Sequence, residues 1–126
     1  MIDDTKQNRT FKMNKLKISS FNIRESNFCK NDKCYRVVDI IEVAKDLEAF
    51  DLPLCGLDIG VRPWGDMTIK NFIYHMSRID KASMDHPVIL DDEGYICDGW
   101  HRVSKAILAG EKTIKAKRLT FMPEPI

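Results

Sequence analysis

The sequence predicts a small α/β domain of the α+β kind, in which one mixed β-sheet packs with about three helices. Two observations support this class. Three stretches carry apolar residues at helical spacing, and short alternating or β-branched runs lie between them, separated by turn-forming residues. A chain of 126 residues is typical of one domain with a modest core. We expect that domain over 15–121, with a flexible arm over 1–14 and a tail over 122–126.

The composition argues against two classes of protein. With a formal net charge of +1, the chain lacks the global basic field of dedicated nucleic-acid binders. No apolar run approaches the roughly 18 residues that span a bilayer, so no membrane partner is expected. The N-terminus also lacks the apolar run of a secretory signal, and the expected location is therefore the cytoplasm.

Cysteine spacing gives no metal signature. The four cysteines are Cys29, Cys34, Cys55 and Cys97, and they form no zinc-binding pattern. Cys29 and Cys34 have the spacing to close a small disulfide loop under oxidising conditions, or to contribute to an irregular metal site. Because thiols in the cytoplasm are kept reduced, we expect free cysteines.

The first elements are expected to form a hairpin. Residues 16–23 alternate between apolar and polar types, as a half-buried strand does. Asn31 and Asp32 are a turn signal, and residues 34–38 are expected to form the returning strand.

A helix is expected over 39–50, because Asp39 and Glu42 have the spacing of a capping box. Its apolar stripe is Ile40, Val43, Ala44 and Leu47. Pro53 follows, and the residue before a proline leaves helical space.

The next segment predicts a strand and a rigid loop. In the strand, over 57–61, Asp58 alternates onto the face opposite its apolar neighbours. The loop over 62–66 contains Trp64, which either stacks on a ligand ring or covers the core.

Thr68 is a suitable N-cap for a helix over 69–81. The face expected to be buried carries Ile69, Phe72, Ile73, Met76 and Ile79 or Asp80. His75 lies on a neighbouring face, either as a surface residue or as a proton acceptor beside a phosphate site.

The last third reads as strand, turn, strand, helix and strand. Residues 87–90 and 95–97 are expected to pair through a turn at Gly94, whose acidic neighbours keep it solvated. A helix over 100–109 ends at Gly110, and residues 113–119 alternate as a strand. Two prolines then end the sheet.

The densest chemistry lies at Asp98-Gly99-Trp100-His101-Arg102, where a strand passes into a helix. A helix start presents free amides and a partial positive charge, so it attracts anions. Gly99 allows a ligand to approach the backbone, and Arg102 can bind a phosphate through two hydrogen bonds. The alternative is that Asp98 only caps the helix, His101 packs in the protein and Arg102 lies on the surface.

In this context the DGWHR turn resembles the ParB/sulfiredoxin superfamily, and most of all its small ParB-like proteins of phages and mobile elements. The sequence PWGD at 63–66 adds to the resemblance. It implies a sulfiredoxin-like fold and a turn that binds nucleotide phosphates or a phosphorylated intermediate. Trp100 stands where sulfiredoxin-like enzymes have cysteine, and Arg102 is a single arginine where partition proteins have two. Sulfinic-acid reduction and a sliding partition clamp are therefore not expected.

The first functional hypothesis is a nucleotide-binding protein that hydrolyses a nucleotide or transfers a phosphoryl group. The expected ligand is ATP, ADP or CTP with Mg²⁺, held at Gly99, Trp100, His101 and Arg102 and bordered by Trp64. Asp98, His101 and His75 are the catalytic candidates. Asp98 with Asp58, or with Asp66, is the expected pair of metal ligands.

Two alternatives come from other classes. The first is a nucleic-acid-associated ParB-like nuclease or DNA-binding protein, for which Lys115 and Lys117 share one face of the last strand. The second is a phage accessory protein that catalyses nothing and acts through a host protein.

Overall fold

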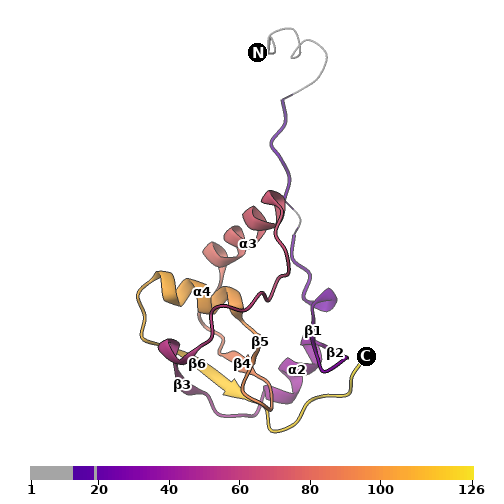
Figure 1. Ribbon diagram of the computed structural model, residues 1–126, viewed down its shortest axis with the longest axis vertical. Helices are drawn as coiled ribbons and strands as arrows, with labels where there is room; N and C mark the ends of the chain where they lie inside the picture. The colour runs from indigo at the N-terminus through magenta and orange to yellow at the C-terminus, as the bar shows by residue number, and fades with distance from the viewer. Residues whose placement is uncertain (1–12, 19) are drawn as a thin grey trace.

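The protein is a mixed α+β fold with two β-sheets, in agreement with the predicted class (Figure 1). The computed structural model describes residues 13–18 and 20–126. The strands are β1 (Asn27–Lys30), β2 (Lys33–Arg36), β3 (Phe50–Pro53), β4 (Val88–Leu90), β5 (Ile96–Asp98) and β6 (Thr113–Arg118). The α-helices of this described part are α2 (Val37–Ala44), α3 (Ile69–Lys81) and α4 (Trp100–Leu108), with 3-10 turns at Ile23–Glu25 and Leu54–Gly56.

The four-stranded sheet has the order β3-β6-β4-β5, while β1 and β2 pair as a separate hairpin. β6 runs antiparallel to β3 and parallel to β4, and β4 runs antiparallel to β5. Parallel strands need a crossover connection, which β5 and α4 provide between β4 and β6. The sheet is therefore mixed, as the sequence predicts.

Both faces of the sheet are covered. Val88 and Leu90 on one face of β4 pack with Val103 of α4, whereas Ile89 on the other face packs with Ile40 of α2. Successive side chains of a strand point to opposite faces, so β4 contributes to both clusters. α4 covers one face, and α2 with the β1–β2 hairpin covers the other.

Most of the second half forms as predicted. Thr68 caps α3, its hydroxyl oxygen accepting a hydrogen bond from the Asn71 amide at 3.2 Å. The turn before β5 uses Gly94 at a φ of +96°, and α4 ends at Gly110 with a φ of +76°. The Gly110 amide donates to the carbonyl of Ile107, as in the predicted helix end.

The predicted strand over 16–23 is wrong. Its described part carries no strand and ends in the 3-10 turn at Ile23–Glu25. β2 pairs instead with β1, through the predicted turn at Asn31 and Asp32, whose φ angles are +52° and +64°. The segment before β1 is held by α3, because the guanidinium carbon of Arg78 lies 3.5 Å from the Phe21 ring centroid.

The helix predicted over 39–50 begins two residues earlier, at Val37, and ends at Ala44. Arg36 is the N-cap and no side chain caps the helix, so the predicted capping box of Asp39 and Glu42 does not form. Glu42 pairs with Lys45 at 2.7 Å instead. Burial of Val37 sets this start, because the helix then packs Val37 and Ala44 into the protein.

Residues 50–53 form β3 where the sequence predicts the end of a helix. Phe50 and Leu52 lie opposite Ala116 and Ile114 of β6, so sheet pairing outweighs local helix propensity. The strand predicted over 57–61 is absent, and this stretch is irregular.

The buried face predicted for α3 is also wrong. None of the residues of this helix is buried. Ile69, Phe72, Ile73 and Met76 are exposed, and Ile79 is half-buried. The other elements already cover both faces of the sheet, so α3 packs against α4 instead.

The acidic turn before β5 anchors the β1–β2 hairpin, and the prediction that its acidic residues keep it solvated is wrong for Asp91. Asp91 is fully buried and its Oδ1 accepts hydrogen bonds from the Glu93 and Tyr95 amides at 2.9 and 2.8 Å. Lys30 Nζ lies 3.0 Å from Asp91 Oδ2 and also contacts Asp92 and Glu93. Burial lowers the pKa of Lys30, but the hydrogen bonds to these carboxylates outweigh burial and raise it.

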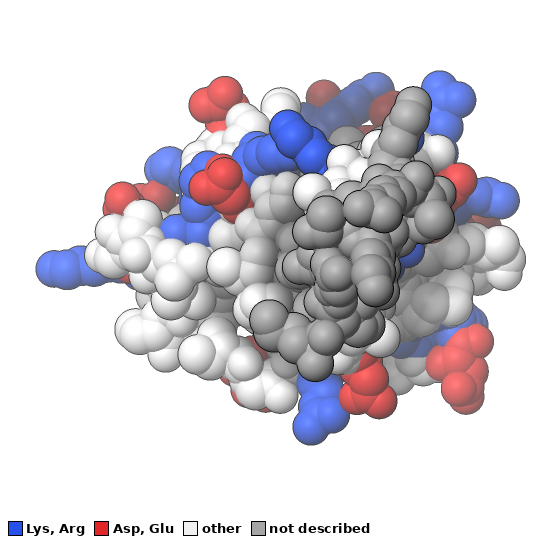
Figure 2. Space-filling model, turned by 90° about the horizontal axis from the view of Figure 1, so that it is seen from above, with Lys and Arg blue, Asp and Glu red and all other residues white. Residues whose placement is uncertain are grey.

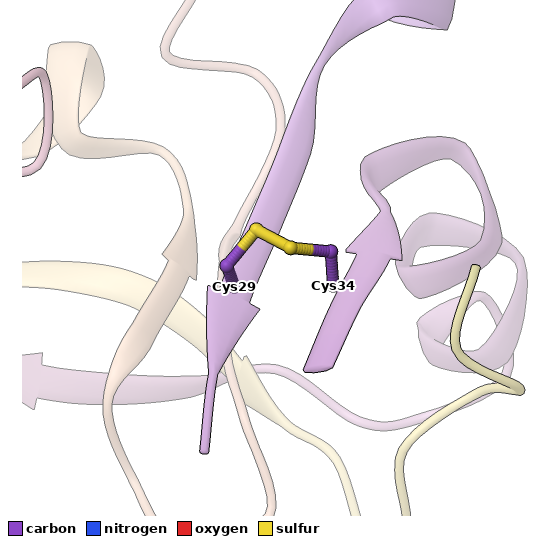
Figure 3. The surroundings of a disulfide bond; sticks show 2 residues. All are labelled: Cys29 and Cys34. Carbon is purple, nitrogen blue, oxygen red and sulfur yellow. A yellow bond between two sulfur atoms is a disulfide. The ribbon is translucent and has the colours of Figure 1, made fainter. Parts of the chain in front are cut away.

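Cys29 and Cys34 form a disulfide, so the expectation of free cysteines is wrong at these positions (Figure 3). The two residues lie directly opposite each other in β1 and β2, with Cα atoms 4.0 Å apart. The Asn31-Asp32 turn creates this pairing. Cys55 and Cys97 are free, and burial, followed by Asp91 and Asp98, raises the pKa of Cys97 to about 12.

The C-terminal tail lies against the hairpin. The Ile126 amide donates to the Cys34 carbonyl at 2.8 Å, and Met122 packs on the cluster around Ile40. Most of the predicted arm over 1–14 lies outside the described residues. Within the described part of the chain, none of the helices has the length and apolar character needed to cross a membrane.

Candidate functional site

A cavity of about 820 Å³ lies beside the β5–α4 turn. α3 and the C-terminal end of α2 form two of its walls, and the segment before the Ile23–Glu25 turn forms another. Its polar lining consists of Lys45, Tyr74, Ser77, Arg78, Lys81, His86, Asp98, His101, Arg102 and Lys117, with Ser20 and Ser83. The apolar lining includes Phe21, Ile41 and Ile89. The predicted Asp98, Gly99, His101 and Arg102 therefore share one cavity.

Gly99 serves the packing of the protein itself. It has a φ of +116°, and a Cβ atom there would lie 2.6 Å from Val88 Cγ1 and 2.9 Å from Arg102 Nη2. On the side where a Cβ would lie, the space beside Gly99 is filled by the protein's own side chains, while Gly99 also lines the cavity. Only glycine fits between β4 and the Arg102 side chain.

Asp98 and Arg102 form an ion pair inside the cavity. Arg102 Nη2 donates to Asp98 Oδ2 at 2.9 Å, and both side chains are largely buried. No side chain caps α4 at Gly99, so the simple capping role considered for Asp98 does not hold. Arg102 Nε is buried and has no hydrogen-bond partner among the described residues. One edge of the guanidinium is thus satisfied, and Nε remains an unused donor.

Arg78 is a cavity residue that the sequence does not single out. It lies one turn after Tyr74 on the face of α3 opposite the apolar stripe, and the Phe21 ring covers its guanidinium at 3.5 Å. Burial lowers the pKa of Arg78, while Tyr74 and Asp98 partly offset that effect. Its only sequence signal is the spacing of Tyr74 and Arg78, which places both on one helix face.

Two lysines bring further positive charge to the same cavity. Lys117 Nζ donates to the carbonyls of Ala44 and Lys45 at 3.2 and 3.1 Å, where it satisfies the C-terminal end of α2. Lys45 pairs with Glu42, at the outer rim. These contacts orient the two ammonium groups.

His75 and His101 form a hydrogen-bonded pair under Trp64. His75 Nδ1 lies 2.8 Å from His101 Nε2, and the Trp64 ring stacks on them with centroid distances of 4.3 and 4.5 Å. Burial lowers the pKa of both imidazoles, with Arg78 next in effect, and the pKa of His101 falls to about 3. Both rings are therefore neutral at pH 7. Trp64 covers the pair and does not line the cavity.

The remaining predicted residues lie elsewhere. Trp100 packs against the core cluster around Val103 and is absent from the cavity wall. Asp58 is exposed and accepts a hydrogen bond from the Gly60 amide at 2.8 Å, outside the cavity. Asp66 is exposed beside Arg62 at 3.4 Å. No group of three or more metal-binding side chains occurs in the described residues.

Comparisons with known proteins leave the family open. The chain matches no protein-family model, no curated protein and no solved structure. The resemblance to the ParB/sulfiredoxin superfamily therefore stays a prediction from the sequence.

Proposed function

We propose that the cavity beside the Gly99–Arg102 turn binds a phosphorylated anion, with a nucleotide such as ATP, ADP or CTP as the expected ligand. One observation carries this proposal. Among the described residues that line the cavity, five are Lys or Arg and one is a carboxylate, Asp98, although the whole chain has a net charge of only +1. Such concentration of one sign in a concave site raises the local concentration of anions.

The phosphates are expected at the start of α4. This helix presents free amides there, and Arg102 and Arg78 add guanidinium groups. A phosphate that binds Arg102 competes with Asp98 for the guanidinium and supplies an acceptor for its unused Nε. Partial burial of Arg78 makes an anionic partner more favourable, because the buried charge lacks an ion pair in the described residues.

The remainder of the cavity suits an organic group. Phe21, Ile41 and Tyr74 give it apolar and aromatic walls, and its volume of about 820 Å³ lies in the range of small-molecule sites. Asp98 is the one described carboxylate in the lining, and a Mg²⁺ ion bound to phosphates needs only one or two protein carboxylates. Asp58, outside the cavity, does not fit the metal role expected from the sequence.

We propose that the cavity binds this ligand, and we assign no reaction to it. Hydrolysis or phosphoryl transfer would need a proton acceptor, and an imidazole with a pKa of about 3 is a weak one. The catalytic roles of Asp98, His75 and His101 stay predictions. We assign to the histidine pair the positioning of α3 beside α4, since it joins the two helices.

The structure gives less support to the nucleic-acid alternative. Positive and negative side chains are interspersed around the visible part of the face in Figure 2, without a continuous basic band. Lys115, one of the two lysines on which that alternative rests, pairs with Asp51 at 2.7 Å. A partner in a host protein and a phage origin stay predictions from the resemblance.

The proposed location in the cytoplasm conflicts with the disulfide between Cys29 and Cys34, which is typical of oxidising compartments. Mass spectrometry after rapid alkylation of cells that produce the protein would measure the redox state of these residues. Fully alkylated thiols would support a reducing compartment.

Calorimetric titration tests the proposed ligand. We expect wild-type protein to bind at least one of ATP, ADP and CTP, and Arg102→Ala and Arg78→Ala each to weaken binding by at least ~1.5 kcal/mol, the lower range for a charge-assisted hydrogen bond. Titrations with and without Mg²⁺ separate the role of the metal.

Arg36→Ala is the matched control, because Arg36 is an exposed arginine outside the cavity. It should bind like the wild type. Equal affinity of Arg102→Ala and wild type would remove Arg102 from the site, and absence of heat with every nucleotide would refute the proposal.

A further inference from the structure

α3 has its polar face inside and its apolar face outside. It is 13 residues long and none of them is buried. Ile69, Phe72, Ile73 and Met76 are 76, 51, 45 and 46% exposed, whereas Val103 and Ala106 of the neighbouring α4 are fully or almost fully buried.

The opposite face of α3 explains this inversion. Tyr74 and Arg78 line the cavity, and His75 bonds to His101 of α4. Lys105 of α4 also donates to the carbonyls of Asp80 and Ala82 at the C-terminal end of α3. Polar contacts therefore dock the helix, and its apolar stripe is left without a partner in the described part of the chain.

The exposed stripe is preceded directly by another apolar residue, Met67, which is 41% exposed. Together with Met67 the stripe amounts to an exposed surface on the order of 500 Å², comparable with the largest apolar patches on monomeric proteins, which are often functional. An amphipathic helix of this kind needs a cover for its apolar face.

We propose that this face pairs with the same face of a second copy of the chain, with the two α3 helices antiparallel. The spacing of the stripe is the reason. Its positions i, i+3, i+4 and i+7 read the same in both directions, so a two-fold axis between Phe72 and Ile73 places every apolar residue opposite another. Phe72 meets Ile73 of the second copy, and Ile69 meets Met76.

The area of the α3 stripe and the charge around it suit pairing with a second copy of the chain. Two such faces provide on the order of 1,000 Å² of buried apolar surface, near the lower bound for a specific interface. No acidic or basic residue lies within the stripe, and a net charge of +1 per chain gives little repulsion between copies. The interface lies on the opposite side of α3 from the cavity, so this inference does not depend on nucleotide binding.

Sedimentation velocity tests the pairing. We expect the wild-type protein to be a dimer at about 100 µM, and Phe72→Glu to be a monomer at the same concentration. Leu108→Glu is the matched control, because Leu108 is 75% exposed on α4 and lies outside the surface. This control should remain dimeric. A monomeric wild type, or a dimer that survives Phe72→Glu, would overturn the proposal.

Cross-linking tests the orientation. In a Cys55→Ser background, Ile69→Cys and Met76→Cys proteins are oxidised separately and as a mixture. Antiparallel pairing predicts a cross-linked dimer in the mixture and little in either protein alone. Efficient cross-linking of each variant by itself would show parallel helices and contradict the antiparallel arrangement.

Discussion

Gly99 has the strictest requirement of any single residue in the turn. Its φ of +116° is unfavourable for other residues, and an added Cβ would lie 2.6 Å from Val88. We therefore expect Gly99→Ala to lower the free energy of unfolding by about 2–3 kcal/mol, from backbone strain and steric overlap together. Urea denaturation followed by circular dichroism measures this change.

Substitutions at two other glycines separate backbone strain from steric overlap. Gly110 has a φ of +76° but open space around its Cβ position, so Gly110→Ala should cost only ~1 kcal/mol. Gly56 has neither a positive φ nor a close neighbour at its Cβ position, and Gly56→Ala should change stability by no more than about 0.5 kcal/mol. Equal losses in the Gly99 and Gly110 variants would mean that the contact with Val88 is not tight.

His101 should make stability depend on pH. Its pKa in the folded protein is about 3, below the ordinary 6.5, so the unfolded chain binds the proton more readily. Stability is complete above about pH 6.5 and falls as the pH drops toward 3. Because the ring is partly exposed, we expect a loss of roughly 0.5 kcal/mol per pH unit, below the limit of about 1.4 for a fully buried group.

Denaturation between pH 7 and 5 limits the measurement to the histidines, because most carboxylates stay ionised there. His75, whose pKa burial also lowers, contributes to the loss in the same direction. His101→Gln should flatten the profile, while His86→Gln, which changes an exposed histidine, should keep the wild-type slope. An unchanged slope in His101→Gln would show that the ring is not buried as described.

At the scale of elements, the disulfide sets the stability of the β1–β2 hairpin. Closing so short a loop is worth on the order of 2 kcal/mol in the chain-entropy treatment. We expect a reducing agent to lower the free energy of unfolding by that amount, with the largest loss of amide protection in β1 and β2. Hydrogen exchange with and without dithiothreitol measures both the free energy of unfolding and the protection of each amide.

The double variant Cys29→Ser, Cys34→Ser is the control, and a reducing agent should leave its stability unchanged. If wild type and this variant respond alike, the bond does not form in solution. If the amides of β1 and β2 stay protected from hydrogen exchange, that protection would then be due to Lys30, which holds the hairpin to the acidic turn before β5.

The elements that the sequence predicts well have strong local signals. α3 begins at its predicted cap, Thr68, and Gly94 and Gly110 mark the turns around β5 and α4. Where tertiary contacts determine the secondary structure, prediction from the sequence fails. Burial of Val37 moves the start of α2, and pairing with β6 turns 50–53 into a strand.

The site was predicted in part, for the same reason. Asp98, Gly99, His101 and Arg102 are adjacent in sequence, so one motif brings them together. Arg78 and Lys117 join them only through the packing of α3 and β6 around the cavity, which no local pattern encodes. The ion pair of Asp98 with Arg102 likewise depends on the i, i+4 geometry that the structure shows.

At the scale of the whole molecule, one cavity concentrates positive charge in a chain that is almost neutral. The residues that line the cavity come from both ends of the domain, from Ile18 to Lys117. A ligand there would contact elements that are far apart in sequence, so binding should raise the stability of the entire fold.

The most direct measurement is an NMR titration of ¹⁵N-labelled protein with ATP, in which each backbone amide is followed. We predict that the amides of residues 99–103 shift most, together with the Arg78 side chain, and that all of these shifts follow one binding curve. Shifts confined to other surfaces, or no shifts at millimolar nucleotide, would contradict the proposed anion site.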